Sequence, residues 1–466
     1  MNGNINRRLI VQIVLVATIG GFMFGYDSGV INGTQKGLEA AFDLGRLGIG
    51  INVGAILLGS AIGAFGAGRL SDLIGRRATM MVSAMLFILS AVLAAVAGSS
   101  GLFIIARIIG GLGVGAASVT SPVYISEVTP AYIRGRLSSI QQVMIIAGLT
   151  GAFVANFVLA RYAGGSTEPL WGEYAAWRWM FGLQVIPAAI YLVALCFIPE
   201  SPRYLVVKGH DERAQAVLTR LFGTEEATRK VAEIRASLAA DHHRPKLADL
   251  MDKGTGRIRP ILWAGIGLAV FQQLVGINVV FYYGATLWEA VGFTEDYALQ
   301  TNILSGVLSI GACLLAIALI DRIGRKPLLL IGSAGMAVTL AVVAWAFSTA
   351  VPDGAGGLTL PGHSGVIALV AANLYVIFFN ISWGPVMWVM LGEMFPNQIR
   401  GSALAVAGFA QWTANAAISV SFPTLAVTPG LATTYVFYAV AAAVSFFFVR
   451  AMVQETRGRE LEDMEG

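Results

Sequence analysis

Long apolar stretches alternate with short polar connections along almost the whole chain. A helix needs about 20 mainly apolar residues to cross the hydrocarbon core of a bilayer. Twelve stretches meet that length, and each predicts a membrane-spanning helix. They cover residues 9–31, 47–67, 78–98, 102–125, 136–160, 178–198, 260–287, 299–320, 328–348, 364–391, 400–423 and 431–453.

One sizeable polar interruption, residues 201–257, lies between the sixth and seventh stretches. Its apolar positions Ala214, Leu218 and Leu221 recur at helical spacing among basic residues, which predicts amphipathic helices on the membrane surface. We therefore expect an all-α membrane protein of two six-helix bundles, residues 1–200 and 258–466, joined by a cytoplasmic helical linker of residues 201–257. The last residues, 454–466, form a short cytoplasmic tail.

Composition and charge agree with this interpretation. Hydrophobic residues make up 56% of the chain and charged residues 12%, against about 25% charged in soluble domains, and the mean hydropathy is +0.72. Of the 31 Lys and Arg residues, the predicted outer loops hold only Lys36, Arg46, Arg161 and Arg178, and Arg107 lies within a span. This positive-inside bias predicts that both termini are cytoplasmic. The basic pI of 9.1 follows from the same asymmetry and does not indicate nucleic-acid binding.

A set of charged motifs occurs once in each half of the chain, in the same order. The segment 68–77 returns in shortened form at 321–326, the pair Glu127 and Arg134 returns as Glu393 and Arg400, and the segment 199–203 has a looser counterpart at 455–458. Parallel repeats in a membrane protein predict a transporter with its binding site between the halves. The charged members are Arg69, Asp72, Arg76, Arg77, Glu127, Arg134, Arg136, Glu200, Arg203, Asp321, Arg322, Arg325, Glu393, Arg400 and Glu455.

These charges sit at the predicted cytoplasmic ends of spans. In a transporter whose halves rock, such groups pair in one state and separate in the other. The alternative is that they only anchor helix ends at the headgroups. Their occurrence in both halves favours a role in gating.

Asp27 lies deep inside the first predicted span. An ionised carboxylate there costs roughly 2.5–3.5 kcal/mol on insertion scales, so it is rare without a function. Arg107 is the one basic residue in the interior of a predicted span, away from its ends, and is the natural partner. Two interpretations remain open: a carboxylate that loads and releases a proton during transport, and a static ion pair that fixes helix packing.

Uncharged amides and aromatic rings gather in the central parts of several spans. Amides both donate and accept hydrogen bonds, and with aromatic walls they suit a ligand rich in hydroxyl groups, such as a sugar. A single buried amide more often makes a helix–helix hydrogen bond of about 0.6 kcal/mol, but the cluster exceeds that need. Helix breaks expected at Gly276 and at residues 382–385 also favour a site there. The side chains are Gln142, Gln272, Gln273, Asn278, Tyr282, Tyr283, Asn380, Trp383, Trp388, Gln411, Trp412 and Asn415.

Four segments give the chain a family resemblance: residues 24–31, 107–111, 199–203 and 272–278. On these motifs the chain resembles the sugar porters of the major facilitator superfamily, most of all the bacterial proton-coupled xylose and hexose symporters. The resemblance implies that Gln142, Gln272, Gln273, Asn278, Trp383 and Gln411 hydrogen-bond the sugar. It further implies that Phe24 and Trp412 line the cavity, that Tyr282 and Tyr283 form an outer gate, and that Asp27 carries the coupled proton.

The chain departs from the family pattern at two positions. Ser309 replaces a sugar-binding Asn, and Leu149 replaces a second Gln of the xylose symporter type; Asn380 is a candidate for the replacement amide. These changes leave the choice among xylose, glucose and related sugars open.

The predicted function is a monomeric proton-coupled monosaccharide symporter that works by alternating access. Its partners are the sugar, the proton and the lipid bilayer. A facilitative uniporter with a structural Asp27 is the alternative, and a sugar sensor is a more distant one. The spans contain no nucleophile–base pair, metal-ligand cluster or phosphate-binding loop, so we expect no enzymatic activity, cofactor or metal.

Overall fold

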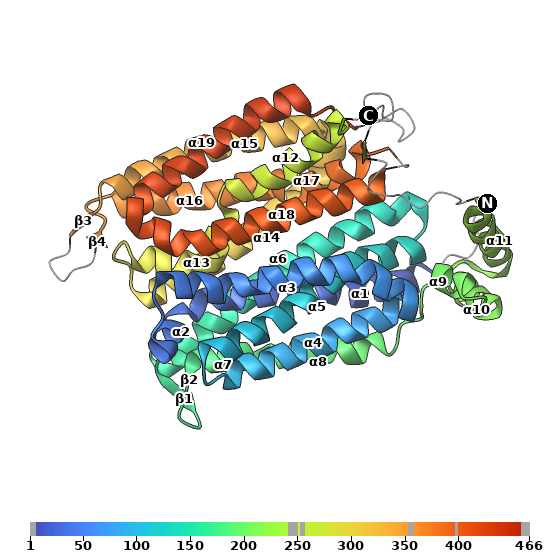
Figure 1. Ribbon diagram of the computed structural model, residues 1–466, viewed down its shortest axis with the longest axis horizontal. Helices are drawn as coiled ribbons and strands as arrows, with labels where there is room; N and C mark the ends of the chain where they lie inside the picture. Colours follow the sequence, from blue (N-terminus) through green and yellow to red (C-terminus); the bar gives the residue numbers. More distant parts are fainter. Residues whose placement is uncertain (1–5, 241–249, 252–256, 353–357, 397–398, 458–466) are drawn as a thin grey trace.

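The computed structural model describes residues 6–457 except 241–249, 252–256, 353–357 and 397–398, with backbone only at 131–139, 237–240 and 400–401. Long helices lie side by side and fill most of the molecule (Figure 1). The N-terminus, the C-terminus and three short helices share one end, which we call the linker end. Two small β-hairpins mark the opposite end, which we call the hairpin end (Figure 1).

The N-terminal half contains the first set of long helices. Its helices are α1 (Arg7–Val30), α2 (Gln35–Phe42), α3 (Arg46–Ile74), α4 (Arg76–Val96), α5 (Ser100–Val128), α6 (Ala131–Ala163), α7 (Ala176–Leu183) and α8 (Val185–Leu195). A short 3₁₀ turn, η1 (Ile31–Gly33), joins α1 to α2, and the hairpin of β1 (Pro169–Trp171) and β2 (Tyr174–Ala175) joins α6 to α7.

The linker forms α9 (Pro202–Val207), α10 (Asp211–Phe222) and α11 (Thr224–Ala240). Ala214, Leu218 and Leu221 lie on the buried side of α10, as their spacing predicts. The part of the linker at 241–249 and 252–256 falls outside the described residues.

The C-terminal half repeats the pattern. Its helices are α12 (Pro260–Leu274), α13 (Ile277–Glu289), α14 (Glu295–Ile323), α15 (Arg325–Ser348), α16 (Ser364–Ile381), α17 (Trp383–Met394), α18 (Arg400–Leu425) and α19 (Leu431–Met452), and β3 (Val351–Pro352) pairs with β4 (Leu358–Thr359). Among the described residues, eleven helical stretches are long and apolar enough to cross a membrane. The longest, Ser402–Met452, contains two crossings, because η3 (Ala426–Gly430) interrupts it with an extended Thr428 (φ −133°, ψ 105°).

The predicted helix breaks are confirmed. Gly276 separates α12 from α13 with φ +81°, a conformation that glycine adopts without steric cost. Ser382 separates α16 from α17 with φ −126° and ψ −91°. A further break, at Gln184 between α7 and α8, was not predicted.

Small residues bring α1 and α6 into close contact. A methyl group on Gly25 would lie 1.7 Å from the Ile145 carbonyl oxygen, and one on Gly148 would lie 1.9 Å from the Phe22 carbonyl oxygen. Because backbone blocks both positions, no side chain can be added without separating the helices. This packing holds Phe24 and Asp27 of α1 at a fixed depth.

The two halves meet at the hairpin end through polar contacts. The Asn32 amide donates to the Phe281 carbonyl (2.8 Å) and accepts from the Ala285 N–H (2.9 Å) and the Asn302 amide (2.8 Å). Phe281 and Ala285 are four residues apart on α13, so Asn32 bonds to both ends of one helical turn. A nearby ion pair joins Lys36 to Glu289.

Candidate functional site

Gln272 is the centre of a buried amide cluster in the C-terminal half. Its Oε1 accepts from the Gln273 amide (3.1 Å) and the Gln411 amide (3.0 Å), and its own Nε2 donates to the Trp383 carbonyl (2.9 Å). Asn278 extends the cluster by donating to Gln273 (2.5 Å). Four predicted sugar ligands from α12, α13 and α18 therefore lie together, across the break at Gly276.

Trp383 takes part in this cluster through its backbone only. Its indole N–H points the other way, donating to Ser333 Oγ (2.9 Å) and the Leu329 carbonyl (3.2 Å), and its side chain is fully buried. Trp388, on the same helix, is 41% exposed. The Trp383 ring, which was predicted to bind the sugar, therefore makes its hydrogen bonds within the C-terminal half.

Asn380 and Ser309 are neighbours. The Asn380 amide donates to Ser309 Oγ (3.2 Å) and to the Val376 carbonyl (2.9 Å), and both side chains are buried. Asn380, predicted to replace the sugar-binding Asn of the family, therefore contacts Ser309, which stands at the position of that Asn.

Gln142, the predicted ligand from the N-terminal half, is half-buried on α6, and its side chain makes no hydrogen bond to the described residues. The halves do meet through an aromatic pair: Phe24 of α1 and Trp412 of α18 have ring centroids 6.0 Å apart. Both were predicted to line a sugar cavity, and they lie on opposite sides of the boundary between the halves.

The two tyrosines of the predicted outer gate have separate contacts on α13. The Tyr282 carbonyl accepts from the Gln35 amide of the N-terminal half (2.5 Å). The Tyr283 hydroxyl donates to the Ser419 carbonyl (2.6 Å), and its ring packs on Phe422 with centroids 5.1 Å apart. Tyr282 therefore belongs to the contact between halves, and Tyr283 to the C-terminal half alone.

Asp27 and Arg107 form a buried ion pair, as predicted, with side chains each 1% exposed. Arg107 also donates to the Asp27 carbonyl (3.2 and 3.3 Å), and its guanidinium lies 5.7 Å from the Phe181 ring centroid. Two polar atoms of the pair have no hydrogen-bond partner among the described residues: Asp27 Oδ2 and Arg107 Nε. Asp27 Oδ2, beside the Gln184 amide, can therefore accept a proton without breaking the bond from Arg107 to Oδ1.

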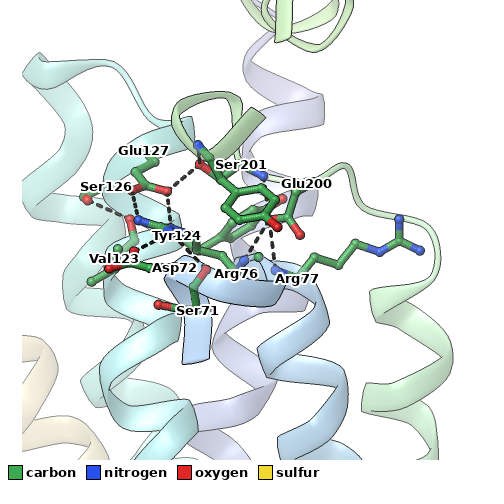
Figure 2. A network of polar contacts seen from close by, with 12 residues as sticks. Ser71, Asp72, Arg76, Arg77, Val123, Tyr124, Ser126, Glu127, Glu200 and Ser201 are labelled. Atoms are coloured by element: carbon green, nitrogen blue, oxygen red, sulfur yellow. Dashed lines mark hydrogen bonds and ion pairs between the residues drawn. The ribbon is translucent and has the colours of Figure 1, made fainter. Parts of the chain in front are cut away.

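A network of charges closes the linker end of the N-terminal half (Figure 2). Arg76 donates to both oxygens of Glu127 (3.0 Å each) and to Asp72 (3.0 Å). Glu200 accepts from the backbone N–H groups of Arg76 (2.9 Å) and Arg77 (3.1 Å). Ser201 also donates to Glu127, so α3, α4, α5 and α9 are joined.

The C-terminal half repeats this network. Arg325 donates to both oxygens of Glu393 (2.9 and 3.0 Å) and pairs with Asp321 (3.0 Å). Glu455 accepts from the backbone N–H groups of Arg325 (3.0 Å) and Lys326 (2.9 Å). Burial alone would raise the pKa of Glu455, but these and other backbone donors hold its pKa below the ordinary value. Glu455 therefore stays ionised and bound near neutral pH.

The remaining motif residues stand outside these networks. Arg69 and Arg203 are exposed and have no ion pair within the described residues, and Arg322 contributes only its carbonyl, to Arg457 (2.6 Å). The side chains of Arg134, Arg136 and Arg400 lie outside the described residues. Every motif ion pair that the structure describes lies within one half.

We predict that Arg76→Ala destabilises the N-terminal half, whereas Arg69→Ala does not. Arg76 and Glu127 are 11% and 8% exposed, and removing one partner of such a pair costs about 3 kcal/mol. The thermal midpoint in detergent should fall by several degrees for Arg76→Ala. An equal fall for both variants would contradict a specific role of the network.

The chain matches the family model described as sugar (and other) transporter over residues 13–466. It is 48% identical to a glucose transport protein of Synechocystis, covering 98% of this chain and 97% of that protein. It is 38% identical to the D-xylose-proton symporter of Escherichia coli, covering 100% and 97%.

Solved structures of a related transporter agree with these sequence matches. The inward-open xylose transporter XylE of Escherichia coli superposes with a TM-score of 0.83 at 36% identity, covering 98% of this chain and 99% of that chain. The same symporter bound to 6-bromo-6-deoxy-D-glucose gives a TM-score of 0.80 at 38% identity, covering 98% and 99%. The chain is therefore a sugar transporter and belongs to the sugar porter family of the major facilitator superfamily.

Proposed function

We propose that this protein carries a monosaccharide, xylose, glucose or a related sugar, into the cell together with a proton. The observation that carries the proposal is the buried Asp27–Arg107 pair with its unpartnered carboxylate oxygen. A proton can bind at this second oxygen while Arg107 keeps its hydrogen bond to the first, as a proton carrier requires. The relatives named as a D-xylose-proton symporter and an arabinose-proton symporter, 38% and 35% identical, support it.

The sugar would bind where the amide cluster faces Phe24 and Trp412. Gln272, Gln273, Asn278 and Gln411 already exchange hydrogen bonds with each other, so a sugar would replace bonds rather than leave groups unpaired. Gln142 would contribute from the N-terminal half. Trp383 would act through Gln272, whose amide its carbonyl holds.

Alternating access accounts for the contacts between the halves. The described contacts join the halves at the hairpin end. The distribution of basic residues would place that end outside the cell, so this state would be closed to the outside. The likeness to an inward-open relative fits the same state. The motif networks would hold each half rigid, and the exposed motif arginines would pair across the halves in the opposite state.

Domain boundaries, orientation and oligomeric state complete the proposal. The bundles would comprise residues 1–200 and 258–466, with 201–257 as a cytoplasmic linker. Both termini would face the cytoplasm, and the protein would work as a monomer in the inner membrane. The excess of Lys and Arg residues in the segments at that end supports this orientation.

We predict that Asn32→Ala opens the hairpin end more often. The variant loses three hydrogen bonds between the halves, each worth about 1 kcal/mol, which shifts the balance of states by roughly a hundredfold. Spin labels on exposed positions of α2 and α14 would report longer distances. As a control, Asn52→Ala loses bonds within the N-terminal half only. Unchanged distances in Asn32→Ala would show that the Asn32 hydrogen bonds do not hold the hairpin end closed.

The proposed function is tested by sugar uptake into proteoliposomes. Labelled xylose and glucose are offered with and without an inward proton gradient. Symport requires accumulation above equilibrium only with the gradient. Equal uptake in both conditions would support the alternative, a facilitative uniporter.

A further inference from the structure

Buried polar side chains occur at three levels inside the N-terminal half, between α1, α5 and α8. We call them the polar column and define it as Asp27, Gln184, Tyr191, Ser121 and Tyr124. Each of these residues is at most 1% exposed. The amide cluster, in contrast, lies in the other half.

The first level is the free side of Asp27. A methyl group on Gly110 would lie 2.7 Å from Asp27 Oδ2, so the unpartnered oxygen faces α5. Gln184 lies beside this carboxylate. Its amide makes no regular hydrogen bond at either atom within the described part of the chain.

The second level is a pair of hydroxyls. A methyl group on Gly20 would lie 2.7 Å from the Tyr191 oxygen and 3.1 Å from Ser121 Oγ, so both converge on the same point of α1. The Tyr191 hydroxyl lies beside Ser121 Oγ but makes no regular hydrogen bond among the described residues, and Ser121 itself donates to Met80 Sδ (3.7 Å). Leaving such a hydroxyl unpaired costs about 1–3 kcal/mol, and a buried water would satisfy it.

The third level reaches the linker end. Tyr124, three residues after Ser121 on α5, donates to the Pro199 carbonyl (2.7 Å). Glu127 follows three residues later and belongs to the network drawn in Figure 2. The column therefore ends at charged groups of the linker end.

Helical spacing keeps the levels aligned. Gln184 and Tyr191 are seven residues apart, as are Asp27 and Gly20, so each pair lies on one helix face about 10 Å apart. Between the levels, Ala188 of α8 and Ala117 of α5 are small and fully buried. Small side chains leave the least obstruction to water between the polar groups.

We propose that the proton released from Asp27 reaches the linker end through this polar column, while the sugar leaves between the halves. The Asp27 carboxylic acid gives its proton to a water beside Gln184. Each following hydroxyl accepts one proton on its oxygen and passes its own proton on. The last proton passes from Tyr124 to water at the linker end, so Tyr191, Ser121 and Tyr124 end unchanged and uncharged. The inference rests on the proposed symport and assigns Tyr191 as a relay.

The test compares two tyrosine variants in proteoliposomes. Tyr191→Phe keeps the buried ring and removes only the hydroxyl. Tyr435→Phe removes an equally buried and unpartnered hydroxyl from the C-terminal half. A pH dye inside the vesicles follows sugar-driven proton entry, and sugar exchange by counterflow, which needs no proton release, is measured in parallel.

The expected result is a fall of roughly tenfold in proton entry and gradient-driven uptake for Tyr191→Phe, with counterflow unchanged and Tyr435→Phe normal. Ser121→Ala should act in the same direction. A normal Tyr191→Phe, or an equal loss of counterflow, overturns the relay alone. A wild type without gradient-driven uptake overturns the symport and the relay together.

Discussion

Asp27→Asn is expected to abolish gradient-driven sugar accumulation while sugar exchange by counterflow continues. Asparagine has the shape of a protonated aspartic acid but cannot release a proton. Its oxygen can still accept from Arg107, so the packing of α1 against α5 should survive. The carrier would then cycle as though permanently protonated.

The size of this loss follows from the coupling energy. One charge moving through 100 mV supplies about 2.3 kcal/mol, which corresponds to roughly fiftyfold accumulation. The variant should accumulate no sugar above equilibrium at any gradient. Labelled sugar inside proteoliposomes, measured at steady state, gives the accumulation ratio directly.

A matched control exists at the hairpin end. Asp43 is exposed and has a left-handed backbone (φ 50°), which asparagine tolerates, so Asp43→Asn should accumulate sugar normally. If Asp27→Asn still concentrated sugar under a gradient, the buried pair would be structural and the uniporter would be the better description.

Much of the fold was predictable because span length and charge asymmetry are properties of the sequence itself. The breaks at Gly276 and Ser382 were also predictable, since glycine and proline carry local signals. The break at Gln184 was missed. Its residues are all compatible with helix, and only Pro187, shortly after it, hinted at an interruption. The hairpin strands were missed because two- and three-residue strands have no periodicity to read.

The site was predictable in its members more than in its contacts. A lone carboxylate and a lone guanidinium inside spans have few possible partners, so Asp27 and Arg107 were paired correctly. Trp383 shows the opposite case: sequence position cannot tell that its indole faces Ser333. Likewise Gln184 is one amide among many until the structure places it beside Asp27.

Gln272→Ala is expected to weaken sugar binding about a hundredfold. Gln272 donates to the Trp383 carbonyl of α17 and accepts from Gln411 of α18, and it also accepts from its neighbour Gln273. Its removal deletes one sugar ligand and leaves the Gln273 and Gln411 amides without their acceptor, a combined cost of about 3 kcal/mol. The loss should appear in the sugar Kd, measured by calorimetry on purified protein, and in the KM of uptake.

Two comparisons separate binding from folding. Gln300 is half-buried on α14, and its side chain bonds only to Asp296, so Gln300→Ala should bind sugar normally. Gln272→Asn keeps the amide on a shorter side chain and should retain part of the affinity.

If Gln272→Ala bound sugar like the wild type, the buried amides would serve only to bond the helices together, and the sugar site would have to lie elsewhere between the halves. A different result is a lower sugar affinity of Gln272→Ala with an unchanged thermal midpoint in the absence of sugar. In that case, sugar hydroxyls would replace the hydrogen bonds that join α12, α17 and α18. Binding would then loosen one set of helix contacts as it forms another, which couples occupancy of the site to movement of the halves.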